Sequence, residues 1–313
     1  MTDEIDLAEL LKTLDSDTRT ELDSKPTVEA WTDNFDVTKL PVEARKWVQV
    51  PDLVAVVADL KSSTHLGTGK HAASTASIYQ AATGGLVSIY DEFDADFIAI
   101  QGDGAFALFW GDRRYERAMC AGITVRTFSE RHLVDRLEKK WKDPEFPTGF
   151  KVGVSCGRVL VKRVGTPRNL AQQEPVWAGK PVNYAAKAAQ QADRHELIVT
   201  GSVWDKIEKN DYLTISCGCS GGIFTASPTE LWEDVTIEKV PSDDDERYGR
   251  LLGAAWCVKH GAEFCSAILA GQTKRSNVDE VRAQVAESQM ENALRWKAVH
   301  DRRERRRLRA LSR

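Results

Sequence analysis

The stretch from Leu53 to Ala58 is apolar at all six positions, and three of them are β-branched valines. A continuous apolar run of this length, rich in valine, is typical of a strand buried on both faces of a sheet. Two further apolar runs, 97–100 and 105–110, lie on either side of Gly102-Asp103-Gly104. This pattern predicts two more strands joined by a tight hairpin turn. The centre of the chain is therefore expected to contain a sheet with covered faces.

Helical patterns alternate with these strands, which predicts an α+β fold with a mixed sheet. Ser62-Ser63-Thr64 offers N-cap chemistry for a helix reaching about Phe93, although Gly84-Gly85 should loosen it. A long helix with one apolar side is expected from the positions of Met119, Ile123, Phe128 and Leu133. The remaining expected elements are strands at 150–156, 158–164, 197–200, 213–216 and 231–237, and a helix starting near Pro181 after a polar loop.

The two ends differ from this central block. Residues 1–46 carry apolar positions at helical spacing (Leu7, Leu10, Leu11 and Leu14), which predicts one or two helices. Gly253 to Leu269 is a fairly apolar helical segment, and a long charged helix is expected from Val278 to the end. We interpret the six arginines between 302 and 309 as a solvated helix end. The sequence thus predicts a helical N-terminal extension (1–46), a central domain (47–240) and a helical C-terminal extension (241–313).

Charge and composition exclude several classes of partner. The formal net charge of −4 gives no reason to expect binding to nucleic acid or to an anionic membrane. The acidic N-terminus is not followed by an apolar stretch, so it does not resemble a signal peptide, and no apolar run is long enough to cross a bilayer. We therefore expect a cytoplasmic protein. Its six cysteines should then be thiols or metal ligands rather than disulfides.

Two aspartates are expected where strand ends meet. Asp59 follows the buried strand, and Asp103 lies in the hairpin turn. Carboxylates are hard oxygen ligands of the kind that Mg²⁺ prefers, and two of them can hold a pair of metal ions that bind a triphosphate. Each aspartate alone also has an ordinary structural interpretation, as a helix cap or a turn residue. Their combination with a third motif is more informative.

Three motifs together resemble those of the class III adenylate and guanylate cyclases, over about residues 50–235. They are Asp59-Leu60-x-x-Ser63-Thr64, Ile100-Gln101-Gly102-Asp103 and Gly179-Lys180-Pro181-Val182-Asn183-x-Ala185-Ala186, in the order and spacing of that family. The resemblance implies a ferredoxin-like catalytic domain with a mixed, mostly antiparallel sheet and flanking helices. It also implies a homodimer whose active sites lie at the subunit interface, and an enzyme that converts a nucleoside triphosphate to a 3′,5′-cyclic monophosphate and pyrophosphate.

The family's site residues can be carried over where the motifs match. Asp59, the Leu60 carbonyl and Asp103 would hold two Mg²⁺ or Mn²⁺ ions. The other subunit would supply Asn183, which orients the ribose, and Lys187, where the family usually has an arginine that neutralises charge on the α-phosphate. Asn183 and Lys187 are four residues apart, so a helix places both on one face. The phosphate oxygens would be bound by the backbone amides of Ser62, Ser63 and Thr64.

The positions that read the base depart from the purine-specific members of the family. Those enzymes usually carry polar residues where this sequence has Ala99 and Val176, and neither side chain can form a hydrogen bond. The chain therefore resembles the bacterial pyrimidine cyclases linked to antiphage defence, whose cyclic UMP or cyclic CMP activates a downstream effector. We favour UTP over CTP, with Trp177 as a stacking surface. The alternatives are a purine cyclase that uses other positions and a catalytically silent nucleotide-binding module.

A second constellation lies outside these motifs. Cys217-x-Cys219 and Cys257-x-x-His260-x-x-x-x-Cys265 contain soft thiolates and an imidazole, which are typical zinc ligands. A closed set of four would form a structural zinc site. The alternative is that these cysteines only fill the core, as we expect for Cys120 and Cys156.

Overall fold

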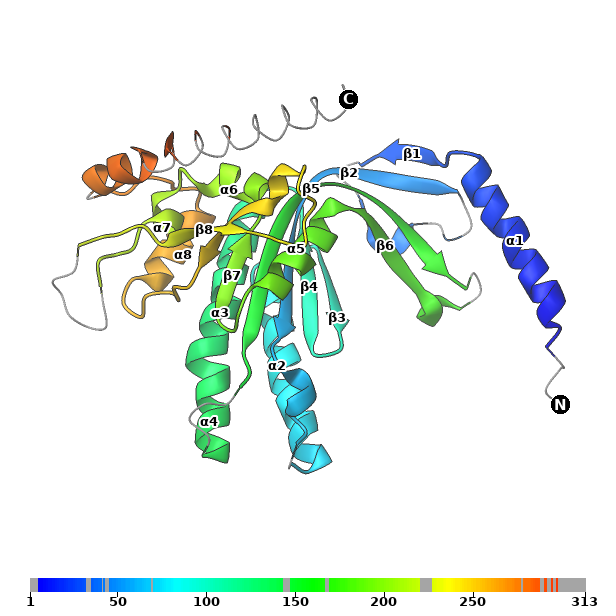
Figure 1. The fold of residues 1–313 in the computed structure, drawn as a ribbon, viewed down its shortest axis with the longest axis horizontal. Helices are drawn as coiled ribbons and strands as arrows, with labels where there is room; N and C mark the ends of the chain where they lie inside the picture. Colours follow the sequence, from blue (N-terminus) through cyan, green and yellow to red (C-terminus); the bar gives the residue numbers. More distant parts are fainter. Residues whose placement is uncertain are drawn as a thin grey trace, which may run out of the picture. The chain divides into compact units, whose positions relative to one another are not determined.

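The computed structural model describes residues 5–31, 35–40, 42, 45–68, 70–142, 147–166, 169–219, 227–276 and 278–287, together with residues 290, 291, 294 and 297 (Figure 1). The chain forms two compact units, Met1–Leu53 with Gly157–Pro181, and Val54–Cys156 with Val182–Arg313. Among the described residues, no helix has both the length and the apolar character needed to cross a bilayer.

The sheet is mixed and mostly antiparallel, as expected. Its strands follow the order β3-β4-β2-β5-β7-β9-β8, with β1 added to β2 and β6 added to β5. The strands are β1 (Thr27–Ala30), β2 (Lys46–Leu60), β3 (Phe97–Gln101), β4 (Gly104–Phe109), β5 (Phe150–Gly165), β6 (Gln173–Gly179), β7 (Glu196–Val199), β8 (Trp232–Thr236) and β9 (Tyr248–Leu252). The helices are α1 (Leu7–Asp23), α2 (Ala72–Glu92), α3 (Arg114–Phe128), α4 (Asp135–Trp141), α5 (Lys180–Gln191), α6 (Gly201–Ile207), α7 (Asp211–Thr214) and α8 (Gly261–Leu269).

The larger unit buries both faces of its part of the sheet. Alternate residues of β2 (Val54, Val56, Ala58 and Leu60) join the core formed with α2 and α3. The opposite face is covered in part by α5, whose buried side chains pack with Ile198 of β7. Successive residues of a strand point to opposite faces, so one apolar run supplies both cores. This explains why the run that begins at Leu53 has no polar position before Asp59.

Helix α2 differs from the prediction at its start and in its middle. Ser63–His65 forms a separate 3₁₀ turn, and α2 begins only at Ala72. The expected loosening at Gly84-Gly85 is wrong, because α2 is continuous. A Cβ on Gly85 would lie 2.6 Å from the Phe128 ring of α3. Gly85 therefore allows α2 and α3 to approach closely.

The long helix after β4 contains a π-helical turn, Ser129–Val134, between α3 and α4. Its predicted apolar side is confirmed, since Met119, Ile123 and Leu133 are buried and Phe128 packs against them. Ser129 accepts a hydrogen bond from the backbone N–H of Phe150 (2.6 Å). A π turn changes the direction of a side chain within a helix, which here aims Ser129 at the start of β5.

Four expectations about the strands are corrected. The two strands expected at 150–156 and 158–164 are one strand, β5, in which Gly157 has a φ of 140°. The polar loop that follows contains β6. Of the strand expected at 213–216, the first two residues belong to the short helix α7 and Ile215 forms only an isolated bridge with Glu230. Asn210 caps α7 by accepting a hydrogen bond from the Tyr212 N–H (3.0 Å). Finally, β9 lies between β7 and β8, so the sheet extends past the expected domain boundary at residue 240.

The smaller unit contains the start of β2 and the end of β5, and each of these pairs with one further strand. β1 pairs in parallel with the start of β2, and β6 pairs antiparallel with the end of β5. Helix α1 confirms the helical spacing of the N-terminal leucines but buries none of its residues. Arg45 joins α1 to this unit through an ion pair with Glu21 (3.1 Å) and a hydrogen bond to Ser24.

The described part of the C-terminal extension is tied to α7. The helix expected over 253–269 is limited to α8, because residues 253–257 have no regular structure. A further helical stretch covers 279–287, and the arginines at 302–309 lie outside the described residues. Arg282 donates from Nε and Nη2 to the two carboxylate oxygens of Asp211, at 2.9 and 2.5 Å. Asp211 is buried, so this contact fixes the extension to the body of the unit.

Candidate active site

Asp59 is a charged residue near the end of β2, on the face of the sheet that α5 partly covers. Its neighbours Ala58 and Leu60 point into the core under α2 and α3, so Asp59 points to the opposite face. There it forms an ion pair with Lys151 of β5, with 2.7 Å between Nζ and Oδ2. The Lys151 side chain is only 16% exposed, whereas Asp59 is 41% exposed. The carboxylate is therefore accessible while its cationic partner is fixed beside it.

The turn that carries Asp103 lies against the end of β2. In the antiparallel ladder Ala58 is paired with Ala105, which places Gly104 opposite Asp59. A Cβ on Gly104 would be 2.4 Å from the Ala58 carbonyl oxygen, so only glycine allows this approach. Gly102 has a φ of 65°, as the tight hairpin requires. The structure therefore brings Asp59 and the Asp103 turn together at one edge of the sheet, as the sequence predicted.

The segment after β2 is held in place at Lys61. Its backbone N–H donates to the Gly149 carbonyl (2.9 Å), and its carbonyl accepts from the Thr148 hydroxyl (2.8 Å). The Lys61 side chain is also ion-paired with Asp193, which holds the pKa of that carboxyl below its ordinary value. Ser62 adopts a left-handed conformation (φ 57°, ψ 30°) and begins the 3₁₀ turn.

This turn corrects the expectation that a helix begins directly after Asp59. The amides of Ser62, Ser63 and Thr64 open a 3₁₀ turn of three residues and not helix α2. The first N–H groups of a 3₁₀ turn have no partner within the turn, as at a helix start, but a single short turn lacks the summed dipole of a long helix. Their role in binding phosphate stays a prediction.

The candidate base-reading residues fall in different units. Ala99 is paired with Phe106, and its neighbour Ile98 packs on the α2–α3 core. Ala99 therefore faces the same side of the sheet as Asp59. Val176 and Trp177 lie on β6 in the smaller unit, where Val176 is 42% exposed and Trp177 is buried. Within its own unit, Val176 thus offers more surface to a ligand than Trp177 does.

Helix α5 presents Asn183 and Lys187 on its outer side. Its inner side packs closely on β5, since a Cβ on Gly153 would be 2.0 Å from the Ala185 carbonyl oxygen. Asn183 is exposed, and Lys187 holds its Nζ 4.9 Å from the centre of the Tyr184 ring. The expected helix and its i, i+4 geometry are therefore present.

Lys151 was not among the residues predicted from the sequence. A signal was available, because Lys151 is the one cation in the otherwise apolar start of the strand at 150–156. Alternation along β5 fixes which of its residues share a face with Lys151. Placing that face on the same side as Asp59 also requires knowing that β5 lies next to β2. The resulting edge combines two carboxylates and one shielded cation. This arrangement can bind divalent cations and the oxygens of a polyphosphate.

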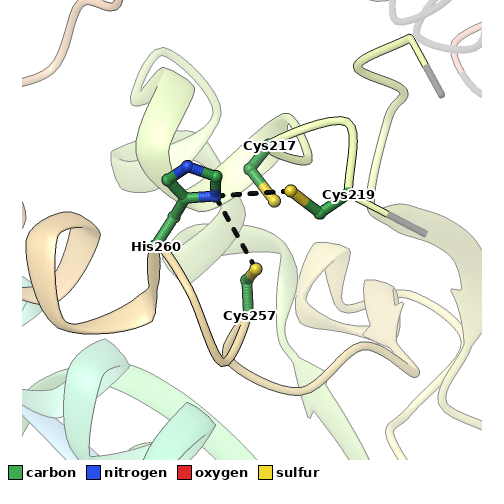
Figure 2. Close-up of side chains that lie close together, drawn as sticks. All are labelled: Cys217, Cys219, Cys257 and His260. Atoms are coloured by element: carbon green, nitrogen blue, oxygen red, sulfur yellow. Dashed lines mark hydrogen bonds between the residues drawn. The ribbon is translucent and has the colours of Figure 1, made fainter. Parts of the chain in front are cut away.

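The cysteine and histidine cluster is the other chemically distinctive feature (Figure 2). Single donor atoms of Cys217, Cys219, Cys257 and His260 all lie within 4.8 Å of one another. Burial opposes ionisation of Cys257, but hydrogen bonds from the His260 and Lys259 backbone N–H groups lower its pKa to about 6. The inclusion of Cys265 is not supported, because Cys265 lies on α8 beside Cys120 (4.0 Å from the Cys120 sulfur to the Cys265 carbonyl oxygen). Cys120 and Cys156 are buried, as predicted.

Comparison with known structures shows which fold the chain adopts. The class III adenylyl cyclase-like ATP-binding protein from Pseudomonas aeruginosa aligns with a TM-score of 0.52 at 15% identity, covering 93% of this chain and 54% of that one. This likeness shows the class III cyclase fold. No family profile matches the sequence.

Comparison with curated sequences is more specific. A uridylate cyclase from Micromonospora echinofusca is 56% identical over 303 residues, which cover 96% of this chain and 97% of that protein. A uridylate cyclase from Propioniciclava tarda is 48% identical over 298 residues, which cover 94% of each chain. The chain belongs to the uridylate cyclase family, a group of nucleotidyl cyclases and hence of phosphorus–oxygen lyases.

Proposed function

We propose that this enzyme converts UTP to 3′,5′-cyclic UMP and pyrophosphate in a homodimer, and that the product is a second messenger in antiviral defence. The cyclase activity is supported most directly by one observation, the meeting of Asp59 and the Asp103 turn at a single sheet edge. The preference for uridine is supported by the two uridylate cyclases that match almost the whole chain.

The donor set at this edge fits two divalent cations. Asp59, Asp103 and the Leu60 carbonyl would hold them, because all three offer the hard oxygen atoms that Mg²⁺ and Mn²⁺ bind. Such ions would supply charge neutralisation and activation of the ribose 3′-hydroxyl. Lys151 already neutralises Asp59 in the protein alone, at 2.7 Å. This ion pair supports the assignment, because it holds the Asp59 carboxylate where it neutralises a positive charge.

The chain's own residues would then hold the triphosphate and orient its reacting atoms. The Lys151 ammonium, held beside Asp59, would be able to pair with a phosphate oxygen, and the backbone amides of Ser62, Ser63 and Thr64 would bind further phosphate oxygens. Asn183 of the second subunit would orient the ribose, so that the 3′-oxygen attacks the α-phosphorus in line. The P–O bond to the pyrophosphate breaks as the new ester bond forms, and the 3′-hydroxyl proton passes to water. Lys187 would stabilise the negative charge that develops on the α-phosphate.

The pyrimidine preference has a physical basis at Ala99, which lies on the Asp59 face and has no polar atom in its side chain. Because the side chain at this position cannot form a hydrogen bond, it adds no binding energy that would favour a purine base. A site that hydrogen-bonds its substrate can reject an analogue by about 10⁴-fold, whereas shape alone gives about 10- to 200-fold. Discrimination among bases should therefore be moderate unless other groups contact the uracil.

The test is a substrate panel with product identification. Purified protein is incubated separately with UTP, CTP, ATP and GTP, with Mn²⁺ or Mg²⁺, and the products are identified by mass. We expect cyclic UMP with the highest kcat/KM for UTP. A higher kcat/KM for ATP or GTP would refute the pyrimidine assignment and leave the cyclase assignment standing. Binding of nucleotides without pyrophosphate release would instead support a silent nucleotide-binding module.

A further inference from the structure

We propose that Cys217, Cys219, Cys257 and His260 bind one structural zinc ion that fastens the C-terminal extension to the catalytic unit. This zinc site is independent of the proposed cyclase chemistry. All four residues lie in the same compact unit, and they come from two segments about 40 residues apart in the sequence. No other group of three or more metal-ligating side chains converges in this way among the residues that the structure describes.

The separations between the donor atoms fit a zinc tetrahedron. Zinc bonds of about 2.3 Å to sulfur and about 2.0 Å to nitrogen place neighbouring donors about 3.5 to 3.8 Å apart. In this structure His260 Nδ1 is 3.5 Å from the Cys219 sulfur and 3.7 Å from the Cys257 sulfur. Figure 2 shows the three sulfur atoms and Nδ1 turned toward a common centre. An ion at this centre would need only small movements of the side chains.

The backbone on each side is shaped for this convergence. Gly218, between the first two cysteines, has a φ of 76°, which lets the chain turn tightly so that both sulfurs face the same way. On the other side, Cys257 and His260 are separated by two residues, a frequent spacing of zinc ligands. The turn is closed by a hydrogen bond from the Gly261 N–H to the Cys257 carbonyl (2.7 Å).

The surroundings explain what the ion would hold together. The first pair of ligands follows α7, and the second pair precedes α8. Arg275 donates to the carbonyls of Ile215 and Ser216, at 2.7 and 3.0 Å, directly before Cys217. Four protein ligands leave no open position for a substrate, so the site would be structural rather than catalytic. The zinc would link two segments that are neither helix nor strand at the four ligand positions.

The test measures metal content and coordination in the full-length protein. The chain is stripped with a chelator, titrated with ZnSO₄ and dialysed, and zinc is then counted by mass spectrometry. We expect about one zinc per chain, with a first shell of three sulfurs and one nitrogen in X-ray absorption. Thermal unfolding should shift upward by at least about 5 °C on loading, because a ligand that binds only the folded state stabilises it.

Matched variants separate this site from other metal binding. Cys257→Ser should lower the stoichiometry below about 0.2 zinc per chain, and His260→Cys should retain it, since Cys₄ is also a zinc site. Cys265→Ser and Asp59→Asn should both keep one zinc. Wild-type protein that retains less than about 0.2 zinc, a first shell without sulfur, or equal loss in Cys265→Ser would overturn the proposal. If Cys257→Ser does not fold, the wild-type titration and its coordination shell decide the question.

Discussion

At the scale of single residues, the charge on Asp59 is not isolated. Lys151 lies 2.7 Å away and is largely shielded from solvent, so the pair is less screened than a surface ion pair. An ammonium held this close keeps the edge of the sheet from accumulating negative charge before substrate binds. In the proposed mechanism, the same ammonium would pair with a phosphate oxygen of the substrate. We therefore expect Lys151 to act both in the free enzyme and with substrate.

Removing this cation should weaken catalysis without abolishing the fold. We expect Lys151→Met to lower kcat/KM for UTP by about 10- to 100-fold, which corresponds to about 1.4 to 2.7 kcal/mol of transition-state stabilisation. Lys151→Arg should recover much of this loss because it restores the charge. Steady-state kinetics together with thermal melting measure both effects. An unchanged kcat/KM in Lys151→Met would show that Lys151 only balances Asp59.

The two aspartates should be far more sensitive. Asp59→Asn and Asp103→Asn keep the shape of the side chain but remove the charge that holds a divalent cation. We expect kcat to fall by roughly 10³-fold in each, since a metal contributes several kcal/mol to such transition states. Pyrophosphate release is the measurement, with circular dichroism to verify the fold. Asp91→Asn, on an exposed part of α2, is the control and should remain fully active. Near-normal turnover in either variant would exclude the two-metal assignment.

Residue-level prediction worked where a motif fixes both identity and position. Asp59 and Asp103 meet because a buried strand and a Gly-Asp-Gly hairpin leave little freedom in where their ends lie. Lys151 was missed because its contact with Asp59 depends on how β2 and β5 are arranged in the sheet, which a single sequence does not show. Cys265 was wrongly grouped with the zinc candidates because helical phase directs it toward Cys120 rather than toward Cys257.

At the scale of elements, prediction failed mainly at glycines and short helices. Gly84-Gly85 indicated a weak helix from local propensity, but Gly85 is required by the close packing of Phe128. Gly157 indicated a break between two strands, but β5 continues through it with an unusual φ. At Gly85 a tertiary contact outweighed the weak helix propensity of glycine. At Gly157 the extended strand outweighed the tendency of glycine to interrupt a strand. The apolar periodicity of α3 was a better guide because it reflects the core directly.

The contact between α7 and the C-terminal helical stretch gives a prediction about stability. Asp211 is buried and accepts from Arg282 and from the Arg275 N–H (2.8 Å). We expect Asp211→Ala to lower the free energy of unfolding by about 3 kcal/mol, because it leaves these donors without an acceptor. Chemical denaturation measures this change. Asp243→Ala, at a more exposed position before the 3₁₀ turn at Asp245–Arg247, should change stability by less than about 0.5 kcal/mol.

The same carboxylate gives a pH dependence of known sign. Burial opposes ionisation of Asp211, but the Arg282 hydrogen bonds outweigh it and hold its pKa below the ordinary value. A depressed folded-state pKa contributes stability that is complete above the unfolded pKa of about 3.9 and is lost as pH falls through the folded value. Wild-type protein should therefore lose more stability below about pH 4 than Asp211→Ala does. Parallel acid-unfolding curves for the two proteins would contradict this linkage.

At the scale of the whole molecule, one sheet face carries most of the proposed chemistry. Asp59, Lys151 and Ala99 point to the face that α5 partly covers, while the other face is filled by α2 and α3. Asn183 lies on the exposed side of α5, turned away from the β5 strand that the helix covers. This orientation suits an amide that acts on a nucleotide bound by another copy of the chain. A head-to-tail homodimer would build two sites in this way.

This arrangement predicts that two inactive variants restore activity when mixed. Asp59→Asn lacks one half of each composite site and Asn183→Ala lacks the other, so each homodimer should be nearly inactive. In a heterodimer one of the two sites receives both intact halves. Random exchange makes half of the dimers mixed, so we expect about a quarter of wild-type activity at equal concentrations. The control mixes Asp59→Asn with Asp103→Asn, which lie in the same half, and this mixture should stay inactive. Activity in the control, or none in the test mixture although mixed dimers form, would show that each chain builds its site alone.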